Sequence, residues 1–171
     1  AALLVFGTVA APAANAYNPD IDGDGIPNTW EMKGYDADGD GKIDVDYPGM
    51  GANPLKKDIF VEMDYMPGLL ASEEELDRIT ESFAQLPLRN PNGTTGINIH
   101  LDAGNARSAK YNLGGGNEVA HEQLDNTMTK WADIRSKNMD SNRESVFHYM
   151  IWGDAYDEYG SSGLGYVGGR G

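Results

Sequence analysis

The stretch IFVEMDYM, residues 59–66, alternates two sets of side chains and predicts a β-strand. One set is almost wholly apolar, and the other mixes apolar with acidic residues. The first set is Ile59, Val61, Met63 and Tyr65, and the second is Phe60, Glu62, Asp64 and Met66. This period of two indicates a strand with one face on a hydrophobic core.

A helix and a second strand are predicted next. Residues 72–86, SEEELDRITESFAQL, begin with a capping box formed by Ser72 and Glu75. Apolar residues then follow at helical spacing, namely Leu76, Ile79, Phe83 and Leu86. Residues 97–104, INIHLDAG, alternate again and predict a strand.

A second helix and a third strand complete the pattern. The helix is predicted over about residues 122–138, with one apolar side made of Leu124, Met128, Trp131 and Ile134. Residues 145–154, SVFHYMIWGD, predict a strand that is apolar on both faces and therefore central. Right-handed crossovers make a parallel sheet the simplest result of this order. The sequence thus predicts an α/β fold, with a mostly parallel β-α-β-α-β sheet and packed helices.

The segment before the first strand is strongly acidic. From Asp20 to Asp46 it contains nine acidic residues and two lysines, a net charge of −7 and half of the chain's −14. Such a charge would repel the phosphates of nucleic acids and of anionic membranes, so neither is expected as a partner. It favours cations.

Residues 20–31, DIDGDGIPNTWE, match the twelve-residue calcium loop D-x-[DN]-x-[DN]-G-x5-E. Side chains at positions 1, 3, 5, 9 and 12 and the carbonyl of position 7 surround one ion in such a loop. The predicted ligands are Asp20, Asp22, Asp24, Ile26, Asn28 and Glu31. Gly25 stands at position 6, where the backbone must turn sharply.

Residues 36–47 repeat this pattern up to its last position. The predicted ligands are Asp36, Asp38, Asp40, Lys42 through its carbonyl, and Asp44. Position 12 is Tyr47, which cannot ligate as glutamate does, and Asp46 could take its place one residue earlier. The last ligand stays open, and about two calcium ions are expected in all.

The two loops are not expected to form paired EF-hands. Four residues separate Glu31 from Asp36, too few for an exiting helix and a new entering one. Pro27 also lacks the N–H that a paired loop would use to bridge its neighbour. Tandem loops over residues 17–50, with one short helical turn near residues 29–33, fit better.

Residues 1–16, AALLVFGTVAAPAANA, have the character of a secretory signal. An apolar run too short to span a membrane leads to small residues and the cleavage pattern Ala14-Asn15-Ala16. We expect a signal peptide remnant, a mature chain from about Tyr17, and a secreted, extracellular protein. The lack of cysteine agrees, because bound calcium can stabilise an exported domain in place of disulfides.

Several segments together resemble secreted bacterial zinc metalloproteases of the zincin type. They are the acidic loops, KKDIFVEMDYM at 56–66, NPNGTTGINIHLDAG at 90–104, LGGGNEV at 113–119 and VFHYMIWGD at 146–154. The acidic loops alone also resemble thrombospondin type 3 calcium repeats.

The resemblance implies that residues 51–171 are the N-terminal portion of a zincin-like domain. In that group an H-E-x-x-H helix, with metal ligands and general base, follows the third strand and a surface loop. No H-E-x-x-H occurs in this sequence, which would end within that loop. The resemblance therefore implies a zinc metallopeptidase parent that cleaves protein or peptide substrates, and a chain that is inactive on its own.

Other polar residues are weaker ligand candidates. His121 to Asp125 read H-E-x-x-D and would share a helix face, but they lie at the start of the second predicted helix, where Glu122 suits the helix dipole. Glu62 and Asp64 could meet His100 and Asp102 across parallel strands, as a further ion site or, preferably, a hydrogen-bonded polar edge. His148 alternates with apolar residues and is expected to be a core histidine.

Two functions of different class follow. The first is the calcium-stabilised N-terminal part of a secreted zinc metallopeptidase. The second is a non-enzymatic extracellular calcium-binding or adhesion module, which leaves the strand-helix domain without a role.

Overall fold

The computed structural model describes residues 19–125 and 127–154. The expected signal remnant, residues 1–16, and the expected loop after residue 154 lie outside them. Across the described ranges, no helix combines the length and the hydropathy that a membrane span requires.

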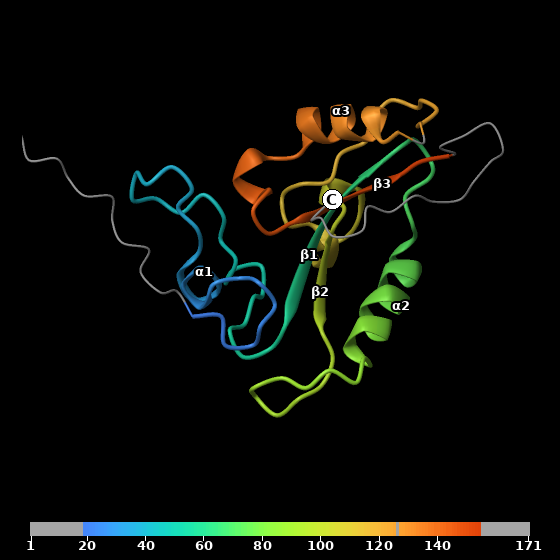
Figure 1. Cartoon of the computed structure of the whole chain (residues 1–171). Helices are drawn as coiled ribbons and strands as arrows, with labels where there is room; N and C mark the ends of the chain where they lie inside the picture. The colour runs from blue at the N-terminus through green and yellow to red at the C-terminus, as the bar shows by residue number, and fades with distance from the viewer. Residues whose placement is uncertain (1–18, 126, 155–171) are drawn as a thin grey trace, which may run out of the picture.

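Three parallel strands form the sheet (Figure 1). They are β1 at Asp58–Tyr65, β2 at Asn98–Asp102 and β3 at His148–Trp152. Their order is β2-β1-β3, and β1 pairs in parallel with both neighbours. The prediction of an α/β fold with a parallel sheet is confirmed.

The prediction that the third strand is central is wrong, because β1 takes that place and β3 lies at an edge of the described sheet. Met150 of β3 is 42% exposed, whereas β1 is buried along most of its length. The sequence pattern did not predict the central position of β1, because this strand contains acidic residues. They are buried and hydrogen-bonded instead of solvated, which a polarity pattern does not reveal.

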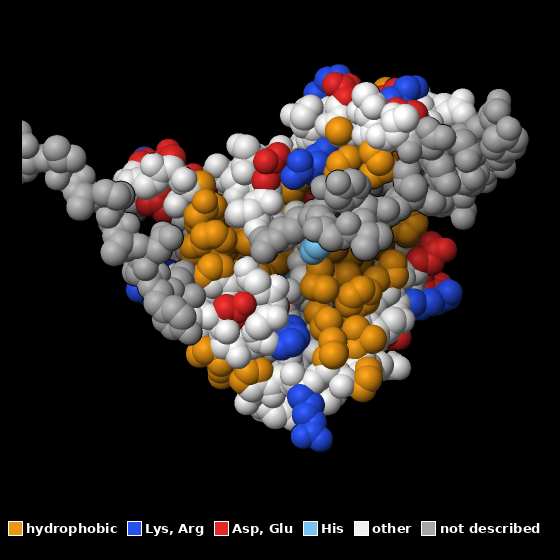
Figure 2. All heavy atoms as spheres, viewed as in Figure 1, with side chains coloured by type: hydrophobic (Ala, Val, Ile, Leu, Met, Phe, Trp, Pro, Cys, Tyr) orange, Lys and Arg blue, Asp and Glu red, His pale blue; other side chains and the backbone are white. Residues whose placement is uncertain are grey.

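Helix α2, Glu73–Ala84, packs against one face of the sheet. Its predicted capping box is present, with Ser72 Oγ accepting the Glu75 N–H at 3.3 Å and the Glu75 carboxylate accepting the Ser72 N–H at 2.8 Å. Hydrophobic side chains gather beside α2 and line a hollow of about 320 Å³ that reaches β3 (Figure 2). Its lining includes Ile59, Val61, Ile79, Phe83, His148, Met150 and Trp152.

The acidic segment and helix α1, Asn28–Lys33, lie on the opposite side of the sheet from α2 (Figure 1). Tyr47 is fully buried there, with its ring centroid 5.4 Å from that of Phe60 and 6.3 Å from that of Phe147. This core also contains Ile26, Val45, Met139, Val146 and Tyr149. The acidic segment therefore contributes apolar anchors to the domain core, and the predicted short helical turn is confirmed as α1.

Helix α3 spans Thr129–Asn138, so the predicted start near Glu122 is wrong. The Asp125 carboxylate accepts the backbone N–H groups of Thr127, Thr129 and Lys130, and Met128 has a left-handed φ of 64°. Because of these features the helix begins only at Thr129. The hydrogen bonds that Asp125 accepts, of which the one from the Thr127 side chain matters most, lower its pKa to about 2. Single 3-10 turns complete the described elements at Gly104–Ala106, Ala109–Tyr111 and Ser141–Arg143.

Candidate metal site

The two acidic loops share one hydrogen-bond pattern. We call residues 20–31 loop 1 and residues 36–47 loop 2. At position 1 one carboxylate oxygen accepts the N–H of position 4 and the other accepts that of position 6. The four bonds are Gly23 and Gly25 to Asp20, at 2.7 and 3.0 Å, and Gly39 and Gly41 to Asp36, at 2.7 and 2.8 Å.

Positions 5, 7 and 9 repeat between the loops as well. The carboxylate at position 5 accepts the N–H of position 7, from Ile26 to Asp24 at 2.7 Å and from Lys42 to Asp40 at 2.8 Å. The side chain at position 9 accepts the N–H of position 2, from Ile21 to Asn28 at 2.9 Å and from Ala37 to Asp44 at 2.7 Å. The position-9 side chains thus stabilise the loops by hydrogen bonding to the backbone. This role is compatible with a position that often contacts calcium through a water molecule.

Position 6 is where the loops need glycine. Gly25 and Gly41 have φ values of 91° and 87°, in the left-handed region that other residues resist. The turn lets the carboxylates before it converge. Oxygens of Asp20, Asp22 and Asp24 lie within 4.8 Å of one another, as do those of Asp36, Asp38 and Asp40.

Loop 1 buries carboxylate oxygens that have no hydrogen-bond donor. Glu31 is 1% exposed and Asp22 is 5% exposed. Both carboxylate oxygens of Glu31 and Oδ2 of Asp22 accept no hydrogen bond from any described residue. Lys57 lies close by, but its ammonium donates to the backbone carbonyl of Asp22. Buried anions of this kind are costly unless a cation or donors meet them.

The pKa shifts in loop 1 also indicate that its buried carboxylates lack a counter-charge. Burial, reinforced by the charges of Asp24 and Asp22, raises the pKa of Glu31 to about 8. Burial and then the charge of Asp24 raise the pKa of Asp22 to about 6, and burial also raises that of Asp24. The local field therefore favours positive charge, and these acidic groups can hold a metal ion.

One member of this group was missed by the sequence prediction. Asp58, the first residue of β1, forms a second set of three with Asp24 and Glu31, again with oxygens within 4.8 Å of one another. Its backbone N–H also donates to Asp24 Oδ2 at 2.7 Å. Asp58 lies far along the chain from loop 1, and the only sequence signal was an acid at the start of a buried strand.

Loop 2 differs from loop 1 in its surroundings. Asp38, Asp40 and Asp44 are exposed, and Lys42 Nζ forms an ion pair with Asp40 at 2.6 Å. At position 12, Tyr47 is in the core. The Asp46 carboxylate accepts the Gly49 N–H at 3.0 Å in the next turn, and Asp46 is outside the group of three.

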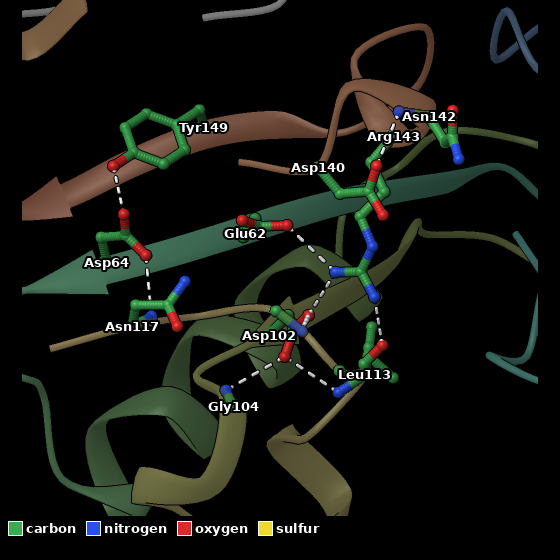
Figure 3. A network of polar contacts seen from close by, with 12 residues as sticks. Glu62, Asp64, Asp102, Gly104, Leu113, Asn117, Asp140, Asn142, Arg143 and Tyr149 are labelled. Carbon is green, nitrogen blue, oxygen red and sulfur yellow. Dashed lines mark hydrogen bonds and ion pairs between the residues drawn. The ribbon is translucent and has the colours of Figure 1, made fainter. Parts of the chain in front are cut away.

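A second set of buried acids has an internal cation and several donors (Figure 3), although Oε1 of Glu62 accepts no hydrogen bond from the described residues. Arg143 Nη1 donates to Glu62 Oε2 at 3.0 Å and to Asp102 Oδ2 at 2.8 Å. Asp102 also accepts the N–H groups of Gly104, Leu113 and Gly115. A Cβ on Gly115 would lie 2.5 Å from both Arg143 Nη1 and Glu62 Oε2, so the loop needs glycine to pass over this ion pair.

Asp64 has its own partners in this region. It accepts hydrogen bonds from the Tyr149 hydroxyl and from the Asn117 N–H, the latter at 2.7 Å (Figure 3). The predicted meeting of Glu62 with Asp102 is thus found as a hydrogen-bonded network, but it is buried and not an edge. His100 belongs elsewhere, with Nε2 2.6 Å from Asp58 Oδ1.

The described residues do not form a zinc site around the H-E-x-x-D segment. His121 to Asp125 are not helical, Asp125 caps α3, and His121 Nε2 lies 3.3 Å from Asp154. None of the metal-holding groups found among the described residues contains histidine. His148, predicted as a core histidine, is half-buried and lines the apolar hollow beside α2.

Comparison with known proteins supplies no identity. No family model, no curated protein and no solved structure matches this chain.

Proposed function

We propose that this chain is a calcium-binding domain of a secreted protein, with one Ca²⁺ held in loop 1 by Asp20, Asp22, Asp24 and Glu31. The observation that carries the proposal is Glu31, whose carboxylate is buried and receives no hydrogen bond from the described residues. Position 12 of a calcium loop is where a bidentate glutamate contacts the ion. The carbonyl of Ile26 and a water held by Asn28 complete the expected shell.

Calcium suits this site better than zinc or magnesium. The grouped ligands are all carboxylates, and the sequence has no cysteine, whereas structural zinc prefers sulfur and nitrogen. Calcium accepts about six to eight oxygens in irregular geometry, while magnesium demands a near-ideal octahedron and retains water. A loop that brings several carboxylates together supports calcium.

Loop 2 is proposed as a second, weaker calcium site. Asp36, Asp38 and Asp40 converge as in loop 1, and Asp44 and Asp46 lie close along the chain. Solvent reaches most of these residues, and no buried glutamate closes the loop. An affinity of about 10⁻⁴–10⁻³ M, the range of extracellular modules, is expected for it, with loop 1 tighter.

Thermal unfolding in excess calcium, in chelator and in magnesium tests the proposal. Calcium should raise the unfolding temperature well above the chelator value, and magnesium should do little. The double variant Asp20→Ala, Asp24→Ala should abolish most of the calcium effect, and Asp36→Ala should remove only a small part. Identical melting of the unaltered chain in calcium and in chelator would refute the proposal.

A further proposal concerns the whole protein. We infer that this domain belongs to a secreted zinc metallopeptidase, with a zinc-bound water supplying the hydrolytic chemistry at residues outside this chain. The parallel β-α-β-α-β order supports this proposal, together with the segments that resemble zincins. The alternative is a non-enzymatic extracellular calcium-binding or adhesion module.

The coding sequence beyond Gly171 separates these two. An H-E-x-x-H motif with a third ligand beyond it would support the metallopeptidase. Further D-x-D-x-D-G repeats without that motif would favour the adhesion module and contradict the enzyme.

A further inference from the structure

We propose that Asp58 is a direct ligand of the loop 1 cation, so that the ion connects loop 1 to the central strand of the sheet. The inference rests on the proposed calcium site and adds to it a ligand that lies outside the loop motif. An ion so placed acts as a cross-link between the N-terminal segment and β1.

The first ground is the arrangement of three acids. Oxygens of Asp24, Glu31 and Asp58 lie within 4.8 Å of one another, a spacing at which one cation can touch all three. Glu31 and Asp58 are 1% and 2% exposed. Both oxygens of Glu31 lack a donor among the described residues, so this buried carboxylate is free to bind a cation.

The second ground is that these three carboxylates have no paired lysine or arginine among the described residues, since the nearby Lys57 ammonium donates to a backbone carbonyl and Asp58 contacts the His100 ring. In the described ranges, no lysine or arginine forms an ion pair with Asp24, Glu31 or Asp58. Three close carboxylates without a cation repel one another strongly where water is excluded. A shared ion changes this repulsion into attraction.

The third ground is that Asp58 is already held in position. Its Oδ2 accepts the Asn53 N–H at 2.7 Å, and its Oδ1 lies 2.6 Å from His100 Nε2. The His100 ring stacks on Phe60 with centroids 4.3 Å apart. Neighbouring groups that orient a ligand in this way typically strengthen metal binding, because less order must be gained when the ion arrives.

The test measures calcium binding by titration calorimetry on the full chain carrying Asp36→Ala, which removes the loop 2 background. Adding Asp58→Asn should raise the Kd of the remaining site by about tenfold or more, as the loss of one charged ligand requires. The matched control is Asp64→Asn, which alters an equally buried acid on the same face of β1 but away from loop 1. Its Kd should stay within about twofold of the parent value.

The calcium-free protein provides a second readout. A merely structural Asp58 would lower the unfolding temperature in chelator when changed to asparagine. A ligand in a repulsive cluster should leave that temperature unchanged or raise it, while reducing the stabilisation by calcium. Should Asp58→Asn fail to fold, Asp58→Ser keeps an acceptor for the Asn53 N–H and repeats the test.

The outcomes are distinct. A Kd for Asp58→Asn equal to that of the parent, or a calcium-bound crystal structure with Asp58 beyond about 4 Å of the ion instead of about 2.3–2.6 Å, would overturn this inference alone. A parent protein that binds no calcium at all would overturn the proposed function with it.

Discussion

Both ends of β1 bury acidic side chains, but their partners differ. At the N-terminal end Asp58 lies with Asp24 and Glu31, and no lysine or arginine of the described chain pairs with them. Towards the C-terminal end Glu62 and Asp64 lie near Asp102, where Arg143 and the Tyr149 hydroxyl donate to them (Figure 3). Among the described residues, the first cluster has no ion-paired lysine or arginine, and the second contains Arg143.

The difference shows how a buried acid indicates its role. Where the fold supplies a guanidinium, a phenol and backbone N–H groups, an internal cation neutralises the acids and they need no external one, even though Oε1 of Glu62 accepts no hydrogen bond from the described residues. Where donors are missing and the pKa of Glu31 rises to about 8 through burial, the acids favour an external cation. Calcium should therefore stabilise the first end of β1 and have no direct effect on the second.

The largest expected effect is at the C-terminal end. Arg143→Met should lower the free energy of unfolding by about 3–5 kcal/mol, because it leaves Glu62 and Asp102 buried without their cation. Chemical denaturation should give the same loss in calcium and in chelator. The control Arg78→Met removes an exposed ion pair with Glu74 and should cost little. If calcium restored the free energy of unfolding of Arg143→Met, the two ends of β1 would not differ in the way proposed.

The next effect is at Glu31. Calcium at about a hundred times its Kd should stabilise the unaltered chain by about 2.7 kcal/mol. Glu31→Gln should lose most of this gain yet be as stable as the unaltered chain in chelator, since it removes a buried charge that has no donor. Melting curves with and without calcium measure both, and the exposed Glu81→Gln serves as the control. Full calcium stabilisation of Glu31→Gln would show that Glu31 is not a ligand.

The pH dependence should be of intermediate size. Burial raises the folded-state pKa of Glu31 from 4.5 to about 8 and that of Asp22 from 3.8 to about 6. The folded protein therefore binds more protons than the unfolded chain in this window, and calcium-free stability should fall from about pH 4 to about pH 8. Saturating calcium should remove this fall, because it binds the ionised carboxylates. Melting in chelator that is flat over this range, or that rises, would contradict the prediction.

The smallest effect is expected at loop 2. Lys42→Gln removes the ammonium that pairs with Asp40 and should tighten calcium binding at the site proposed for loop 2 by about two- to fivefold. Calorimetry on a chain with loop 1 disabled by Asp20→Ala and Asp24→Ala would measure the change. Lys33→Gln is the control, since this lysine lies on α1 outside both loops. Weaker binding after Lys42→Gln would mean that the lysine supports the site instead of competing with the ion.

Local patterns predicted the elements well where a short stretch contains the whole cause. The capping box at Ser72 and Glu75, the glycine turn at Gly25 and the three strands all follow from neighbouring residues. The start of α3 was missed because Asp125 competes for the backbone N–H groups that a longer helix would use.

Partners distant in sequence could not be predicted. Arg143 gives no local sign that it will neutralise Glu62, 81 residues away, and Asp58 gives little sign that it will join loop 1. Both relations arise only when the parallel sheet brings separate segments together. The central place of β1 was not predicted for the same reason. Its acidic residues are typical of a solvated strand, and only their distant partners, Arg143 and Tyr149, explain why they are buried.

The sequence by itself predicted the proposed ligand set of loop 1 and determined the alternation of strands and helices, because spacing and residue type act over a few neighbouring positions. Only the tertiary structure decided which acids stay without a donor and which are neutralised inside the protein. Burial and long-range contact set the energy of a charge, and neither is encoded in a single segment.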